Sequence, residues 1–337
     1  MVIHEGVLSA IGGTPLVRLR QFFSGSDLEL SAKLELLNPG GSMKDRPAVA
    51  ILKHALETGA IQRGSVVIES SSGNMGIGLA QACSYFGLRF ICVIDPKTTV
   101  QNINLLKVYG ATVDMVESPD PQTGEFLQAR LNRVQSLLRS TANSFWPNQY
   151  ANEYNSGAHH QTMREIVNAL GDGPNYLFCA VSTCGTLRGC AEYIRSERLK
   201  TTIFAVDAVG SVIFGGGKSK RLIPGHGAAV RPDLFREGLA HRCIHVTDRD
   251  CIVGCRRLAR REAILAGGSS GAVLMAIAKV REELPAGSTC VGILADRGER
   301  YLDTIYCDHW VREHFGDIAY LWEEQARGAE TCVTGKF

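Results

Sequence analysis

The chain lacks several features that would assign it to a specialised class of protein. No apolar run approaches the ~20 residues that a membrane-spanning helix needs. The 36 Lys and Arg residues nearly balance the 34 Asp and Glu residues, so the net charge is only +2. The N-terminal segment, residues 1–6, has neither the basic segment nor the apolar core of a secretory signal. We therefore expect a cytoplasmic protein that binds neither membranes nor nucleic acid.

The cysteines form no pattern that predicts disulfides or a metal centre. There are 11, an odd number at irregular spacings. Cys251 and Cys255 have helical spacing but no accompanying His/Cys cluster. His159 and His160 are adjacent, and neighbouring residues on a helix point in different directions. We therefore expect buried, reduced thiols and no metal.

Strand-like apolar runs alternate with segments of helical spacing along a chain of 337 residues, which is long enough for two cores. The strands are expected at 66–70, 90–95, 111–116, 176–181, 203–207 and 290–296. The helices are expected at 74–85, 100–109, 124–138, 186–195, 250–266 and 270–283. This βαβ alternation predicts an α/β protein with doubly wound parallel sheets.

One lysine stands on a turn rich in glycine. Pro39, Gly40 and Gly41 precede Lys44, and Asp45 lies where a helix would begin. A lysine amine fixed at such a turn can form a Schiff base with a carbonyl, which is how pyridoxal phosphate is usually held. Taken alone, the segment is also compatible with a solvated lysine at a helix start.

Two further loops have the composition of anion-binding sites. Residues 70–76 follow an apolar strand and precede a helix, and residues 182–186 do the same after the 176–181 strand. The free N–H groups and the dipole at a helix N-terminus favour a phosphate or a carboxylate. Small residues in such loops also allow close packing, so each loop alone permits either interpretation.

Together and in order, these motifs resemble the cysteine synthase and cystathionine β-synthase family, the fold type II enzymes that use pyridoxal 5'-phosphate. The resemblance covers about residues 5–305. The matching segments are 11–19, 33–35, 38–46, 70–76, Gln149, 182–186, 268–272 and 296–301.

The resemblance implies two doubly wound lobes like those of the tryptophan synthase β subunit, with the cofactor in the cleft between them. Residues 1–42 and 147–305 would form the large lobe, residues 43–146 a small mobile lobe, and residues 306–337 a C-terminal extension. We also expect a homodimer that acts on small amino-acid substrates.

The resemblance also implies roles for individual residues. Lys44 would hold the cofactor and serve as general base, Asn74 would contact its ring hydroxyl, and Ser269 its pyridine nitrogen. A hydroxyl at that nitrogen leaves the ring largely neutral, which favours expulsion of a β-leaving group. Ser269 could also be a helix N-cap. The cofactor phosphate would bind Ser182, Thr183, Cys184, Gly185 and Thr186.

The expected reaction is β-replacement, in which an activated serine loses its leaving group and a second substrate adds at the β-carbon. By the family pattern, the substrate carboxylate would bind Ser71, Ser72, the Met75 amide and Gln149.

Three departures from the cysteine synthase pattern bear on the second substrate: Tyr150 replaces Phe, Ser182 replaces Gly, and Met75 replaces Thr. The added hydroxyls of Tyr150 and Ser182 narrow the pocket and suit a larger, polar, carboxylate-bearing nucleophile. In these features and in residues 146–152, the chain resembles the branch that joins O-phospho-L-serine to L-glutamate. That branch makes N-(2-amino-2-carboxyethyl)-L-glutamate, a source of 2,3-diaminopropionate for siderophores and antibiotics.

Three alternatives stay open. Cysteine synthase is the first, and cystathionine β-synthase is weaker because we expect no regulatory domain after residue 337. The third is a catalytically idle homologue that binds a partner protein, since a fold does not guarantee chemistry.

Acidic substrates require specific cations, because the net charge offers no general attraction. Arg130 and the basic segment Lys218-Ser219-Lys220-Arg221 are the candidates. Alternatively, Arg130 and Arg133 form a solvated helix face, and the 214–221 segment is a surface excursion.

Overall fold

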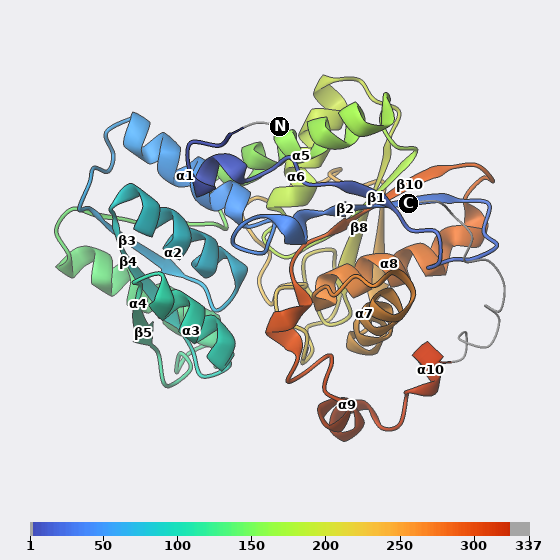
Figure 1. The fold of residues 1–337 in the computed structure, drawn as a ribbon. Coiled ribbons are helices and arrows are strands. Elements are labelled where there is room, and N and C mark those ends of the chain that lie inside the picture. Colours follow the sequence, from blue (N-terminus) through green and yellow to red (C-terminus); the bar gives the residue numbers. More distant parts are fainter. Residues whose placement is uncertain (1–2, 324–337) are drawn as a thin grey trace.

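The computed structural model describes residues 3–323, and their strands form two separate sheets (Figure 1). The larger sheet has six strands in the order β1-β2-β10-β7-β8-β9, and the smaller has four in the order β5-β4-β3-β6. Neighbouring strands are parallel except β1 and β2. The strands are β1 Leu16–Arg18, β2 Glu29–Leu34, β3 Val66–Ser70, β4 Arg89–Ile94, β5 Thr112–Met115, β6 Ser144–Phe145, β7 Tyr176–Ala180, β8 Thr202–Ala208, β9 Arg242–Val246 and β10 Thr289–Leu294.

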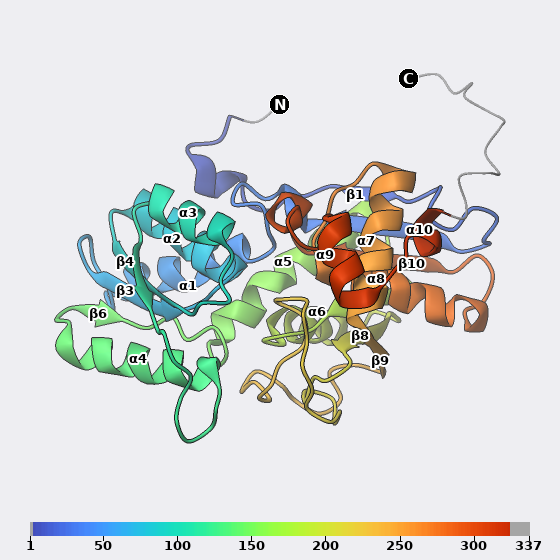
Figure 2. The ribbon, with the colours of Figure 1, turned by 90° about the horizontal axis from the view of Figure 1, so that it is seen from below.

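Helices cover both faces of each sheet, which is why the central strands are continuous apolar runs. In the larger lobe α7 and α8 pack on one face and α5 and α6 on the other. In the smaller lobe α1, α2 and α3 share a core on one face, and α4 covers the other (Figure 2). The helices are α1 Asp45–Glu57, α2 Asn74–Phe86, α3 Val100–Val108, α4 Phe126–Ser140, α5 Glu153–Leu170, α6 Gly185–Ser196, α7 Asp248–Glu262, α8 Gly268–Val280, α9 Asp308–Phe315 and α10 Tyr320–Glu323. Short 3-10 helices span Val7–Ala10, Glu35–Leu37, Arg281–Glu283 and Gly298–Tyr301.

The predicted α/β class with doubly wound parallel sheets is confirmed, but three of the predicted helices had boundaries that differ by two or more residues. The helix predicted for residues 250–266 ends at Glu262, because Ala263 adopts a left-handed φ of 55°. The helix predicted from residue 124 begins at Phe126, because Gly124 has a φ of 69°. Helix α8 begins at Gly268 and gives way to a 3-10 turn after Val280. The proposed lobe boundaries stay a prediction.

A buried ion network ties the N-terminal loop to the helices beside the lysine turn. Arg46 donates to both carboxylate oxygens of Glu35 at 2.7 Å and also pairs with Glu165 at 2.7 Å. Lys33 reaches Glu165 at 2.6 Å, and the Thr14 hydroxyl donates to Glu35 at 2.7 Å. The network therefore joins β2, α1 and α5 and fixes the start of α1, where Lys44 lies.

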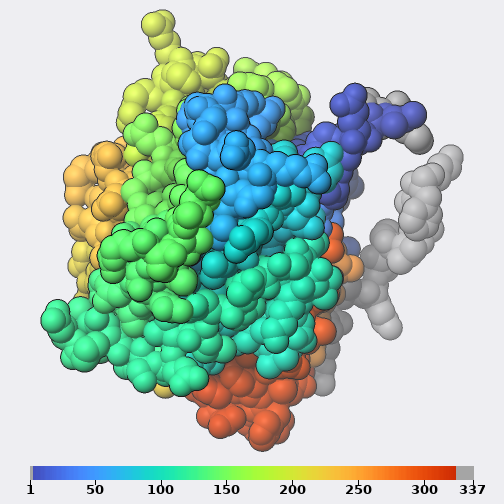
Figure 3. Space-filling model, turned by 90° about the vertical axis from the view of Figure 1, so that its left-hand side faces the viewer, coloured from blue at the N-terminus to red at the C-terminus, as the bar shows by residue number. Residues whose placement is uncertain are grey.

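The C-terminal helices pack against the larger lobe. Arg256 of α7 pairs with Asp308 at 2.7 Å and lies over the ring of Trp322, which is buried. Asp303, in the same C-terminal segment, accepts a hydrogen bond from Gln101 of α3 in the smaller lobe. Figure 3 shows this orange-red segment directly below the teal helices of the smaller lobe. The rest of the predicted C-terminal extension, residues 324–337, lies outside the described residues.

No helix within residues 3–323 has both the length and the apolar character needed to cross a bilayer.

Candidate active site

A cavity of about 890 Å³ opens at the carboxyl ends of strands from both sheets. This is the position at which open α/β sheets bind their ligands. Every residue that the sequence nominated for the site lines this cavity, although the role of each stays a prediction. They are Lys44, Ser71, Ser72, Asn74, Met75, Arg130, Gln149, Tyr150, Ser182, Thr183, Cys184, Gly185, Thr186 and Ser269.

Lys44 is the N-cap residue of α1 and projects from a tight turn into the cavity. The turn depends on Gly41, which has a φ of 82° and would place a Cβ 2.9 Å from the Arg300 guanidinium. Within the described chain the Lys44 amine makes no hydrogen bond or ion pair. Burial lowers its pKa to about 8, against the opposing influence of Cys184 and Asp296. About a tenth of the amine is therefore neutral, and thus nucleophilic, at pH 7, far more than for an ordinary lysine.

The 182–186 loop ends at the N-terminus of α6, as the sequence predicted. The amides of Cys184, Thr186 and Leu187 have no acceptor among the described residues. Together with the positive end of the α6 dipole, they form a site suited to a phosphate. The loop thus has the donors that the anion prediction requires.

Two side chains of α5 support this loop from behind. Asn155 is buried, donates to the Gln149 carbonyl at 2.7 Å and lies so close to Gly185 that a Cβ there would be 2.4 Å from its Oδ1. His159 lies 3.2 Å from the Thr186 hydroxyl, and burial lowers its pKa well below the usual value. The sequence did not single out Asn155, because α5 was not among its predicted helices.

The 70–76 loop presents backbone donors at the N-terminus of α2. The Ser71 hydroxyl accepts from the Gly76 amide at 2.9 Å, so it caps this helix while lining the cavity. The Met75 amide has no acceptor in the described chain, whereas the Met75 side chain is buried in the smaller lobe's core. The free Met75 amide is therefore positioned to receive a carboxylate oxygen.

A buried carboxylate, Asp296, forms the floor of the cavity near Lys44. Asn74 donates to its Oδ2 at 2.8 Å, and the Tyr301 hydroxyl donates to the same oxygen at 2.5 Å. Arg300 in turn donates to the Asn74 side-chain oxygen. Residues 296–301 are one of the segments that resemble the family pattern, but no role was predicted for Asp296. The feature that could have identified Asp296 is its position just after β10, at the carboxyl edge of the sheet.

Gln149 and Tyr150 lie over a buried acid, Glu69. The Glu69 carboxylate accepts hydrogen bonds from the backbone amide of Gln149 at 3.2 Å and from the indole N–H of Trp146 at 3.1 Å. Burial raises the pKa of Glu69 to about 7, and Arg130 is among the groups that oppose this rise. Glu69 therefore fixes the segment that brings the Tyr150 ring to the cavity.

Ser269 is not a helix N-cap, which corrects the structural alternative considered for it. The N-cap residue of α8 is Gly267, and the Ser269 side chain lies in the first turn and lines the cavity. The next serine, Ser270, accepts from the Ala295 amide at 3.0 Å. Ser269 therefore has a hydroxyl free for a ligand, while Ser270 joins α8 to β10.

Arg130 and Arg133 have different environments although both belong to α4. Arg130 is 9% exposed, lines the cavity, and lies 3.2 Å from Asp95 and 3.4 Å from the Ser72 hydroxyl. Arg133 forms a bidentate pair with Asp114 at the surface. The solvated-face alternative is thus wrong for Arg130.

The segment from Lys218 to Ala229 forms the opposite rim of the cavity. Lys218 pairs with Glu125, at the start of α4, and so bridges the larger and smaller lobes. Arg221 is half-buried and donates to the His226 carbonyl at 2.8 Å. The basic 218–221 segment therefore lines the rim of the cavity, with Lys218, Ser219 and Lys220 exposed to solvent.

The cavity thus brings together a nucleophilic amine, a helix terminus suited to an anion and a second set of backbone donors. The distribution matches what a phosphorylated carbonyl cofactor and an amino-acid substrate need: a Schiff-base partner, phosphate donors and carboxylate donors. The cleft also holds a buried arginine, which suits additional negative charge.

Comparison with known proteins gives the same result. Residues 7–296 match the family model described as "Pyridoxal-phosphate dependent enzyme". Among solved structures, the O-acetylserine dependent cystathionine β-synthase from Helicobacter pylori has a TM-score of 0.84 and 30% identity, covering 91% of this chain and 100% of that one. O-acetyl serine sulfhydrylase isoform 3 from Entamoeba histolytica has the same TM-score and identity, covering 90% and 92%. O-ureido-L-serine synthase has a TM-score of 0.84 and 26% identity, covering 94% and 97%.

Proposed function

The chain belongs to the pyridoxal-phosphate dependent enzyme family, and we propose that it joins O-phospho-L-serine to L-glutamate with release of phosphate. Its cofactor is pyridoxal phosphate, and its reaction class is the β-replacement of the cysteine synthase type. The proposed product is N-(2-amino-2-carboxyethyl)-L-glutamate, a precursor of 2,3-diaminopropionate for a siderophore or an antibiotic.

The residues of the cavity fit the cofactor. Lys44 has an unpartnered amine, the α6 terminus has unpartnered amides, and Ser269 has a hydroxyl without an acceptor in the described chain. Lys44 would hold the carbonyl carbon, the 182–186 loop the phosphate, and Ser269 the ring nitrogen. When bound, the cofactor supplies the electron sink that makes the substrate's α-proton removable and its β-substituent a leaving group.

Lys44 is also the group placed to move the α-proton. Its pKa of about 8 lets the amine accept a proton and return it near neutral pH. Asp296 lies close enough to influence that pKa and to stabilise the protonated amine. Lys44 thus combines anchoring with general base catalysis.

The observation that carries the choice of substrates is Arg130. It is buried in the cavity wall beside Ser72, which belongs to the proposed carboxylate-binding loop. Sulfide needs no cation of this kind, whereas O-phosphoserine and glutamate bring a phosphate and a second carboxylate. The hydroxyls of Tyr150 and Ser182 line the same cavity and make no hydrogen bond within the described chain, so they add donors for a polar nucleophile.

The test is a competition between donors and nucleophiles. Purified enzyme is given O-phosphoserine or O-acetylserine with glutamate or sulfide, and the products are identified by mass. We expect the condensed amino acid and one phosphate per turnover from O-phosphoserine and glutamate. Formation of cysteine alone would identify a cysteine synthase, and no product from any pair would support the idle homologue.

Cysteine synthase activity is the second candidate, because an O-acetyl serine sulfhydrylase is among the structural neighbours. A third candidate is a reaction with a larger thiol as the nucleophile, because the O-acetylserine dependent cystathionine β-synthase is also among the structural neighbours. Homocysteine added to the competition distinguishes the third candidate from the second.

We also propose that the enzyme acts in the cytoplasm as a homodimer, with small molecules as its partners. Sedimentation equilibrium of the purified chain would give twice the 36.5 kDa chain mass. A single-chain mass at micromolar concentration would contradict the dimer.

A further inference from the structure

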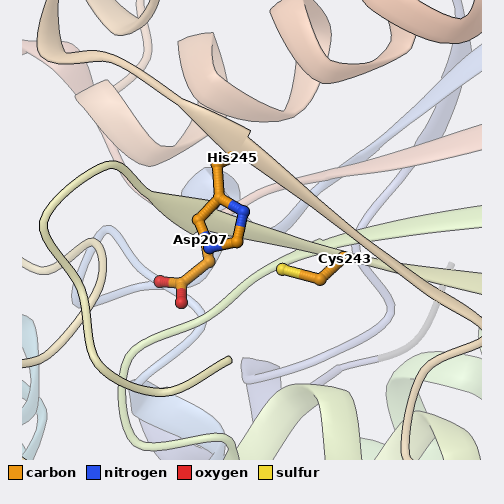
Figure 4. A group of neighbouring side chains, drawn as sticks. All are labelled: Asp207, Cys243 and His245. Carbon is orange, nitrogen blue, oxygen red and sulfur yellow. The ribbon is translucent and has the colours of Figure 1, made fainter. Parts of the chain in front are cut away.

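A cluster of three potential metal ligands lies outside the cofactor cavity, on the last two strands at one edge of the larger sheet. Asp207 comes from β8, and Cys243 and His245 come from β9. One side-chain ligand atom from each lies within 4.8 Å of the others. Figure 4 shows the carboxylate, thiol and imidazole lying near one another on the two strands.

Strand pairing brings the three residues together. Cys243 and His245 are two residues apart on β9, so their side chains share one face of the sheet. Asp207 is the direct partner of His245 in the parallel register of β8 and β9. The expectation of no metal rested on Cys251, Cys255, His159 and His160, and did not consider this Cys-x-His pair, which lies 36 residues after the aspartate.

The Asp207 carboxylate has an acceptor that the protein leaves unused. Its side chain is 0% exposed, and its Oδ2 has no hydrogen-bond partner in the described chain. Its other oxygen accepts from the Ala208 amide at 2.8 Å. The Ser211 hydroxyl and the Phe214 amide lie near the carboxylate, but neither makes a hydrogen bond of normal geometry to Oδ2. A buried oxygen without a partner is costly, and a cation would satisfy it.

The Asp207 carboxylate has no fixed counter-charge among the described residues. No Lys, Arg or His nitrogen within residues 3–323 forms an ion pair with Asp207. The Cys243 thiol has a ligand atom of each of the other two residues within 4.8 Å.

We propose that Asp207, Cys243 and His245 bind a zinc-type divalent ion, with a fourth position open to water. Thiolate, imidazole and carboxylate are the ligands that Zn²⁺ uses, whereas Mg²⁺ and Ca²⁺ require sets of oxygens. Bond lengths of roughly 2.0–2.3 Å place tetrahedral ligand atoms about 3.5 Å apart, so the side chains would move inward by on the order of 1 Å. Cys243 is half-buried and His245 exposed, so both have room to do so and the ion has a route from solvent.

The site would lie behind the phosphate loop of the active site. Burial raises the pKa of the thiol of Cys184, the N-cap residue of α6, and Asp207 and Cys243 lie near enough to add to this rise. Gly216, in the segment after β8, would place a Cβ 3.9 Å from His245 Nε2. A bound ion would therefore join β8, β9 and the start of the segment that leads to the cavity rim.

Titration of the purified holoenzyme with Co²⁺ tests the site, because tetrahedral cobalt bound to a thiolate has charge-transfer and long-wavelength d–d bands. We expect both bands to saturate at one equivalent. Cys243→Ser should abolish the charge-transfer band, and Cys243→Ser, His245→Ala and Asp207→Asn should each weaken binding tenfold or more. Zn²⁺ should displace the cobalt and raise the thermal midpoint of the wild type but not of Cys243→Ser.

The matched control is Cys307→Ser with His309→Ala, which removes the chain's other Cys-x-His pair. It should leave the cobalt spectrum unchanged. The proposal is overturned if the wild type gives no bands at stoichiometric Co²⁺, if Cys243→Ser keeps them, or if the control loses them. Should Cys243→Ser fail to fold by circular dichroism, the exposed His245→Ala decides in its place.

Discussion

The residue that most distinguishes this cavity is Arg130, because a buried cation next to a substrate loop needs a ligand or a fixed partner. Asp95 is within 3.2 Å, but Arg130 Nε has no hydrogen-bond partner in the described chain, so the pair is loosely made. An incoming carboxylate could therefore take up the guanidinium donors that Asp95 leaves open.

Arg130→Ala should raise the glutamate KM about tenfold or more, since a hydrogen bond to a charged group contributes ~1.5–3 kcal/mol. Initial rates at varied glutamate concentrations measure this. Arg133→Ala is the matched control on the same helix and should change nothing, because its partner is Asp114 at the surface. Equal KM values for the two variants would remove Arg130 from the substrate site.

Tyr150 and Ser182 are the residues that we expect to select the second substrate. Replacing both by the cysteine synthase residues, Tyr150→Phe with Ser182→Gly, should slow the glutamate step about tenfold or more, with phosphate release from O-phosphoserine nearly unchanged. Stopped-flow measurement of phosphate release and of product formation separates the steps. An equal loss in both would mean that the two residues support the cofactor and not the nucleophile.

At the scale of elements, the N-terminus of α6 is held in an unusual way. Its N-cap, Cys184, has a φ of 64°, in the left-handed region that favours glycine, and its side chain is buried. The conformation orients the loop's amides into the cavity at a cost of about 1–2 kcal/mol for a residue with a Cβ.

Cys184→Gly should therefore keep the cofactor and change the unfolding free energy by no more than about 1 kcal/mol, because relief of strain offsets lost packing. Cys184→Val should destabilise by more than about 2 kcal/mol, since a β-branched residue fits neither the backbone angle nor the space. Thermal midpoints and cofactor absorbance measure both effects. A strongly destabilised glycine variant would show that the thiol itself supports the loop.

The helices and strands also show which features of the structure could be predicted from the sequence. Strand β3 and the starts of α2 and α3 were predicted to the residue, because small or capping residues separate clear periodicities. The two loops predicted to bind anions were located for the same reason, and both line the cavity. Asn155, His159 and Asp296 were given no roles, because their importance comes from packing across the sheet. The metal-ligand cluster was invisible for a similar reason: only strand register joins Asp207 to His245.

For the whole molecule, the ion network around Glu165 predicts how stability varies with pH. Burial raises the pKa of Glu165, but hydrogen bonds and charge from Arg46 and Lys33 outweigh it and lower the pKa to about 2. A lowered carboxyl pKa contributes stability above the unfolded value of 4.5, and that contribution is lost as the pH falls toward 2.

Glu165→Gln should lower the unfolding free energy at pH 7 by about 3 kcal/mol, because it leaves Glu35 as the only carboxylate that pairs with the buried cations Arg46 and Lys33 among the described residues. Its stability should also fall less steeply than the wild type's between pH 4.5 and 2. Denaturant titrations across this range measure both. Glu283→Gln, which removes a surface partner of Arg242, should have no measurable effect. Parallel pH curves for Glu165→Gln and wild type would refute the assignment.

The pairing of β2 with β10 has a consequence for the order in which the protein forms during synthesis. Glu29 of β2 is the register partner of Thr289 of β10. Strand β2 therefore cannot form its parallel pairing until most of the chain has been synthesised. The smaller sheet needs only residues 66–145 and is complete long before that. On the ribosome, the smaller lobe can therefore fold first, while β1 and β2 stay an unfinished edge that invites mispairing until Leu294 has emerged.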